Sequence, residues 1–175
     1  GITKFTQISL FSVLNNLSNI SFLPEYTPIC GITEEEILEN FMPEIEKMAT
    51  RNKWSVQETH DRLKAYYDGY HFSEENMVDI YNPYSLVNAL QQSRLSNFWA
   101  ASGATSLLRN ILEQSDVTDG GAALFLYQSG YLTIKDSDEF GYVLGFPNEE
   151  VKQALYEMVL PALTLREEGD SQSLQ

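Results

Sequence analysis

The stretch from Tyr66 to Leu86 constrains the fold of this chain more than any other. Its sequence, YYDGYHFSEENMVDIYNPYSL, concentrates aromatic residues between the turn signals Asp68-Gly69 and Asn82-Pro83. The rings are those of Tyr66, Tyr67, Tyr70, Phe72, Tyr81 and Tyr84. Exposed together they would form a sticky patch, so we expect them to be buried. We call residues 66–86 the aromatic crossing. It is predicted to join the end of one helix to the start of another, as the hinge of the core or as a ligand-contacting edge.

Composition limits the classes of protein to which the chain can belong. Its 175 residues, 43% hydrophobic and 12% aromatic, predict a globular chain of one domain or two small subdomains sharing a core. The formal charge of −14 repels phosphate backbones and anionic lipid, so direct nucleic-acid binding is not expected. The single cysteine, Cys30, cannot form an internal disulfide and is expected to be a semi-buried apolar residue. No apolar run approaches the roughly 20 residues of a membrane span, and a cytoplasmic location is predicted.

Two capped helices are expected before the crossing. Pro24 and Pro28 exclude regular structure until Thr33, where Thr33 and Glu36 form a capping box. The apolar stripe of the first helix is expected to comprise Ile37, Leu38, Phe41, Ile45 and Met48. Ser55 and Glu58 repeat the capping pattern, and the stripe of the second helix is expected to comprise Val56, His60, Leu63 and Tyr67. The short link 52–54 makes the pair a helical hairpin.

Helices are also expected after the crossing. Asn82-Pro83 is a strong helix-start signal, because asparagine caps and proline needs no amide partner at the first position. Leu86, Val87 and Leu90 follow at helical spacing, and a short helical turn at Phe98-Trp99 and an amphipathic helix over 104–114 come next.

The last third predicts a helix over 122–128, a strand over 131–134, a turn at 136–138 and a partner strand over 141–144. A long helix follows from Pro147-Asn148. The predicted fold class is mainly α with a small β-hairpin, and the order helix, hairpin, helix is that of a winged-helix-like unit.

Motifs for catalysis and for metal binding are missing from the sequence. It has no GxxxxGK[ST] loop, G-x-S-x-G elbow, HExxH helix, cysteine and histidine cluster or glycine-rich dinucleotide loop. We therefore assign no catalytic and no metal-binding residue. His60 is expected to be a packed core histidine, whereas His71, within the crossing, is a candidate for ligand contact or for core packing.

Six ordered segments resemble the predicted AAA-ATPase-like family, whose members usually end in a PD-(D/E)XK nuclease-like domain. The segments are 1–5 (GITKF), 67–72 (YDGYHF), 80–86 (IYNPYSL), 98–103 (FWAASG), 126–134 (LYQSGYLTI) and 146–151 (FPNEEV). The segments are spread from residue 1 to residue 151, so the resemblance extends over nearly the whole chain. Such proteins are abundant in bacterial anaerobes.

The resemblance implies that the chain is the middle of a larger protein, with a P-loop ATPase core upstream and the nuclease-like domain downstream. ATP and Mg would belong to the parent protein, and the isolated chain would hold neither. The implied units are a remnant strand and turn over 1–32, a helical lid subdomain over 33–115, a winged-helix-like unit over 116–166 and a linker or tail over 167–175.

The resemblance also suggests nucleotide-binding residues. Thr3 and Lys4 follow the strand that carries the γ-phosphate sensor in such ATPases. Asn82-Pro83, flanked by Tyr81 and Tyr84, resembles the lid proline that presses on adenine, and Tyr70 and His71 are candidates for the same cleft. The alternative is structural: Asn82 only caps, Pro83 only starts a helix, and Tyr70 and His71 only pack.

The expected function is therefore that of a lid and C-terminal regulatory part of an AAA-type ATPase. It would contribute to nucleotide sensing and to coupling with the nuclease-like domain, without catalysis of its own. The alternative is a winged-helix module that binds protein or DNA. A third possibility, a self-contained enzyme of unrecognised type, lacks any readable set of nucleophile, base and orienting group.

Overall fold

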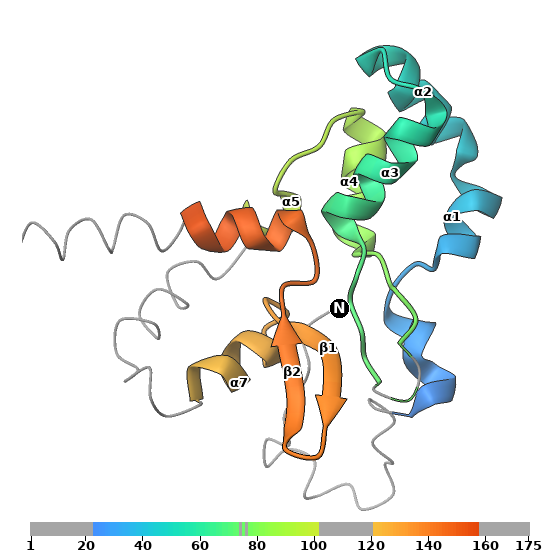
Figure 1. The fold of residues 1–175 in the computed structure, drawn as a ribbon. Coiled ribbons are helices and arrows are strands. Elements are labelled where there is room, and N and C mark those ends of the chain that lie inside the picture. Colours follow the sequence, from blue (N-terminus) through green and yellow to red (C-terminus); the bar gives the residue numbers. More distant parts are fainter. Residues whose placement is uncertain (1–22, 74, 76, 102–120, 158–175) are drawn as a thin grey trace, which may run out of the picture.

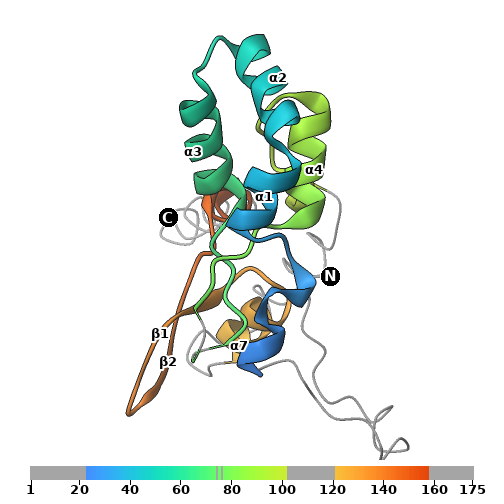
Figure 2. The same cartoon turned by 90° about the vertical axis from the view of Figure 1, so that its right-hand side faces the viewer.

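The computed structural model describes residues 23–73, 75, 77–101 and 121–157. This part is mainly helical with one two-stranded antiparallel hairpin, which confirms the predicted mix of elements. The helices α1 to α4 lie at one end of the molecule, and the hairpin and α7 lie at the other (Figures 1 and 2). The aromatic crossing runs between the two ends. In the described ranges, no helix combines the length and the apolar character needed to cross a membrane.

The helices α1 (Glu34–Asn40), α2 (Met42–Asn52), α3 (Val56–Tyr67) and α4 (Pro83–Gln92) form what we call the helical subdomain. Their buried faces make one core. It comprises Ile37, Ile45, Met48, Leu63, Tyr67, Tyr81, Leu86, Ala89 and Leu90. The crossing therefore contributes Tyr67 and Tyr81 to this core, as expected for aromatic rings placed between two helices.

The first predicted helix is divided into α1 and α2 at Phe41. Pro43 is the second residue of α2 and has no amide proton, and its ring would clash with the carbonyl of residue 39 in a continuous helix. The Thr33 capping box is confirmed, since Thr33 accepts from the Glu36 amide and Glu36 accepts from the Thr33 amide. The prediction that Leu38 is buried was wrong, because this side chain is 51% exposed.

The second capping box is only half formed. Ser55 accepts a hydrogen bond from the Glu58 amide, but the Glu58 carboxylate accepts from Arg62 at 2.8 Å instead of turning back to Ser55. The buried face of α3 holds Thr59, Leu63 and Tyr67. Val56, predicted to be buried, is 39% exposed, and His60 is half-buried at the edge of the core.

Two expectations for the segment before Thr33 were wrong. Residues Pro24–Cys30 form a 3₁₀ helix, η2, in spite of the two prolines. Pro24 occupies the first turn, where an amide proton has no helical partner. Thr27 is buried and donates to the Pro24 carbonyl at 2.9 Å. Cys30, expected to be semi-buried, is exposed.

The hairpin consists of β1 (Thr133–Asp138) and β2 (Gly141–Gly145), which pair from Thr133↔Gly145 to Asp138↔Gly141. The predicted turn at 136–138 was wrong, because these residues continue β1 and the chain reverses at Glu139-Phe140. A register shift between Ile134 and Asp136 adds one residue to β1. The Asp138 carboxylate accepts from the amides of Phe140 and Gly141, which stabilises the later turn.

A second core lies between the crossing and the C-terminal elements. Tyr70 and Ile80 from the crossing pack with Tyr131 and with Val151, which lies on a helix over 149–157. The partly buried side chains around them are those of Phe72, Trp99, Phe125, Leu126, Phe146 and Leu155. The short helix α5 (Phe98–Ala101) and the helix α7 (Gly121–Gln128) confirm the predictions for those segments. The predicted helix over 104–114 and the tail after 166 lie outside the described residues.

The predicted boundaries of the crossing are confirmed. Helix α3 ends at Tyr67, and α4 begins at Pro83 with Asn82 as its cap. Tyr67, Tyr70 and Tyr81 are buried as expected. Tyr66 and Phe72 are only half-buried. Tyr84 is 51% exposed, because the first turn of α4 presents this ring to solvent.

Candidate functional site around the aromatic crossing

The predicted nucleotide-binding residues of the crossing lie together but are mostly covered. Tyr70, His71, Tyr81 and Asn82 are buried, and Pro83 is half-buried. Thr3 and Lys4 lie outside the described residues. A ligand approaching the crossing in this conformation would therefore meet Pro83 and the neighbouring Tyr84, and the other four would lie beneath.

Backbone pairing holds the crossing in place. Tyr70 and Ile80 exchange two hydrogen bonds of 3.3 and 3.2 Å, and Ile32 and Tyr81 exchange two more of 3.3 and 2.9 Å. The Asn82 amide donates to the Tyr67 carbonyl at 2.9 Å, which joins the beginning of the crossing to its end. The sequence did not indicate these bridges, because each pairs single residues rather than strands.

Asn82 is the cap of α4. Its Oδ1 accepts from the amides of Tyr84 and Ser85 at 3.1 and 3.3 Å, which satisfies two of the free donors at the helix start. The Tyr70 phenol is buried and lies within hydrogen-bonding reach of the Asn82 and Asn148 side chains. Burial raises the pKa of the Tyr70 phenol, so this group stays protonated.

His71 connects the crossing to the hairpin. Its amide donates to the Thr133 Oγ1 at 2.8 Å, and Thr133 donates back to the His71 carbonyl at 3.0 Å. The ring Nδ1 donates to the Ile134 carbonyl at 2.8 Å, and Nε2 lies 2.7 Å from the Asp79 carboxylate. Both ring nitrogens face acceptors, and both can donate at once only in the imidazolium form.

Glu150 is a buried carboxylate that joins three elements. It is 0% exposed, and its Oε1 accepts from the Ser85 Oγ of α4 at 3.0 Å and from the Trp99 amide of α5 at 2.8 Å. Its Oε2 has no hydrogen-bond partner. Burial raises the pKa of Glu150 to about 7, although these hydrogen bonds lower it. Neutral pH is therefore close to the pKa of Glu150.

A second polar cluster lies where α1 meets α3. The Tyr81 Oη donates to the Glu34 Oε2 at 2.8 Å, and the His60 Nε2 lies 2.6 Å from the other oxygen of Glu34. The Lys64 ammonium lies 3.7 Å from Glu34 and 3.8 Å from Asp68. His60, expected in the apolar core, thus lies at its polar edge.

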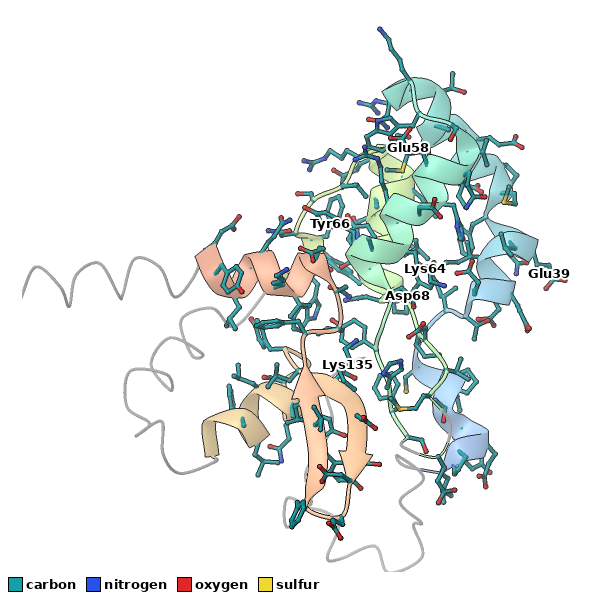
Figure 3. All side chains as sticks on the ribbon, viewed as in Figure 1. Glu39, Glu58, Lys64, Tyr66, Asp68 and Lys135 are labelled. Atoms are coloured by element: carbon teal, nitrogen blue, oxygen red, sulfur yellow. The ribbon has the colours of Figure 1, made fainter. Side chains whose placement is uncertain are left out.

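Asp68 and Lys135 extend this polar region toward the hairpin, and Figure 3 shows Lys64, Asp68 and Lys135 along this side of the crossing. Burial raises the pKa of Asp68 to about 6. The Lys135 ammonium donates to the Gly69 carbonyl at 3.2 Å, and desolvation lowers its pKa. Asn148 donates to the Asp68 carbonyl at 3.0 Å and accepts from the Val151 amide, so it caps the helix over 149–157.

These contacts fix the positions of the polar side chains around the crossing. The nitrogens of His71 and the carboxylates of Glu34 and Glu150 face neighbouring groups, and no nucleophile lies beside a free base among the contacts described here. Within the described ranges, no group of three His, Cys, Asp or Glu side chains is placed to hold a metal ion.

The sequence did not identify four residues that bind or support the crossing, namely Glu34, Asp79, Lys135 and Glu150. Glu150 carried a usable signal: it lies next to Val151 and four residues before Ala154, so it falls on the buried face of its helix.

Comparison with known proteins finds a relative among the curated proteins. The chain is 31% identical, over an alignment of 199 residues, to the "Uncharacterized protein in vnfD 5'region" of Azotobacter chroococcum mcd 1. The match covers 97% of this chain and 36% of that relative, so the chain spans about a third of its length. No family model matches the chain, and no solved structure matches it.

Proposed function

We propose that this chain is the lid and C-terminal regulatory part of an AAA-type ATPase, which responds to nucleotide and couples that response to a neighbouring nuclease-like domain. The observation that carries the proposal is the double attachment of the aromatic crossing. It is bonded to α1 of the helical subdomain through Tyr81 and Glu34 and to the hairpin through His71 and Thr133. A displacement of either end would therefore be transmitted to the other.

The exposed start of α4 is the surface proposed for the base of the nucleotide. Pro83 is rigid and has no amide proton, and the exposed Tyr84 ring beside it offers a flat apolar face. Tyr81 and Asn82 would support this surface from below, and Tyr70 and His71 would hold the crossing against the hairpin. ATP phosphates and Mg would be held by the parent protein's P-loop core, and Thr3 and Lys4 remain the proposed sensor.

The test is a titration of the chain with MgATP, followed by NMR chemical shifts and by phosphate release. We expect no hydrolysis and at most millimolar affinity, with the largest shifts at the start of α4. Tyr84→Ala should weaken the response, whereas the control Tyr142→Ala, which removes an exposed tyrosine from the hairpin, should not. Submicromolar binding, phosphate release, or chemical-shift changes that are the same in Tyr84→Ala as in the wild type would each contradict the proposal.

A second candidate function, a winged-helix-like module that binds protein, is favoured by the tip of the hairpin. Helix α7, the hairpin and the helix over 149–157 follow in the order of such a unit. Phe140 at the tip is 90% exposed, which is costly for a ring without a partner. Asp136, Asp138 and Glu139 surround it and disfavour DNA. Retention of duplex DNA in a low-salt gel shift would support DNA binding instead.

A further inference from the structure

A cleft of about 300 Å³ opens between α1 and α3. We call it the α1–α3 cleft. It is lined by Glu34, Leu38, Met42, Val56, Gln57 and His60. Its volume is at the lower end of the range for small-molecule pockets, so it suits one or two inserted side chains better than a nucleotide.

Two apolar side chains on opposite walls of this cleft are exposed without an evident structural reason. Leu38 and Val56 occupy positions that the helical periodicity of the sequence assigns to buried stripes. Both are nevertheless exposed, and Met42 between them is only half-buried. Apolar side chains that converge on a cleft with a polar rim are typical of a protein interaction site.

The rim of the cleft is acidic. Helix α1 has the sequence EEEILEN, with four glutamates and no basic residue, and Glu39 lies on its outer side (Figure 3). On the opposite wall, Asp61 accepts from Gln57 at 2.9 Å and is itself largely exposed. The nearby Lys64 ammonium lies between the carboxylates of Glu34 and Asp68, which already offset its charge.

We propose that the α1–α3 cleft binds a basic, amphipathic segment of another polypeptide. A leucine- or methionine-like side chain of that segment would enter between Leu38 and Val56. Its lysines or arginines would face Glu35 and Asp61, and Glu39 would add to the negative charge of α1. A second copy of this chain is a poor occupant, because each copy carries a formal charge of −14. The proposal does not depend on nucleotide binding.

The experiment measures binding of a fluorescent helical peptide that has leucine on one face and lysine on the other, by anisotropy at physiological salt. The matched peptide has serine in place of leucine and the same charge. The protein variant Leu38→Ser removes one wall of the cleft, and the control Leu124→Ser removes a leucine of similar exposure (55%) from α7. Both substitutions are at exposed positions, and circular dichroism checks that both variants fold.

We expect the leucine peptide to bind at least about tenfold more weakly to Leu38→Ser than to Leu124→Ser, since a lost apolar contact of about 1.4 kcal/mol is a factor of ten. The serine peptide should bind all proteins weakly and equally. Glu39→Gln should weaken binding of the leucine peptide less at high salt than at low salt. Equal affinity of the two leucine variants, or of the two peptides, would show non-specific attraction to an acidic protein and overturn the proposal.

Discussion

Replacing Glu150 by glutamine should remove a pH-dependent penalty on folding. Burial raises the pKa of this carboxyl from 4.5 to about 7, which corresponds to about 3 kcal/mol at 1.36 kcal/mol per pH unit. Below about pH 4.5 the group is protonated in both the folded and the unfolded state, and no penalty applies. Between about pH 4.5 and 7 the carboxyl ionises in the unfolded state but not yet in the folded state. The free energy of unfolding of the wild type therefore falls as the pH rises. Above pH 7 the penalty is constant.

The Glu150→Gln variant keeps an oxygen that can accept from Ser85 and Trp99 but never ionises. Urea unfolding, followed by tryptophan fluorescence between pH 5 and 8, gives the free energy of unfolding of both proteins. We expect the variant to gain stability relative to the wild type as the pH rises, by up to about 3 kcal/mol at pH 8. Glu39→Gln, an exposed control, should show no such trend. A difference between Glu150→Gln and the wild type that does not change with pH would refute the reasoning.

Three further substitutions test the crossing. Gly69→Ala should lower the free energy of unfolding in urea by about 2 kcal/mol or more. Gly69 has φ +91°, and an added Cβ would clash with the Pro147 carbonyl oxygen. The control Gly141→Ala should cost less, because Gly141 has φ +139° but open space around it. Asn82→Ala should lower the free energy of unfolding by about 1 to 2 kcal/mol through loss of the α4 cap, and a loss below a few tenths would contradict the capping role. Thr133→Val should speed hydrogen exchange of the His71 amide, because this amide loses its acceptor, whereas Thr133→Ser should restore protection. Equal exchange in both variants would argue against this contact.

Local signals in the sequence predicted the helix ends well. Thr33, Ser55 and Asn82 each accept from amides two or three residues ahead, so the residues that decide the cap lie within one turn of sequence. Pro43 carried an equally local signal for the break between α1 and α2 that the apolar stripe obscured.

The errors concern contacts between distant segments. The exposure of Leu38 and Val56 depends on where α1 and α3 sit relative to one another, which periodicity within a helix cannot give. The hairpin turn lies later than predicted because β1 continues to Asp138, and a register shift after Ile134 adds one of the extra residues. Glu150 meets Ser85 and Trp99 across more than fifty positions, so these two partners could not be predicted from its neighbours in sequence, although its place on the buried face of its helix could.

The hydrogen bond from the Asn82 amide to the Tyr67 carbonyl closes residues 68–81 into a loop with a fixed neck. Because this bond joins the end of α3 to the start of α4, the two helices keep their mutual orientation whatever the length of the chain between Tyr67 and Asn82. Loop-closure entropy rises only slowly with added residues, about 0.6 kcal/mol for each doubling. Residues could therefore be inserted next to the exposed Met77 and Val78 while α3 and α4 stay packed, whereas the buried Tyr70, His71 and Ile80 have to stay in place.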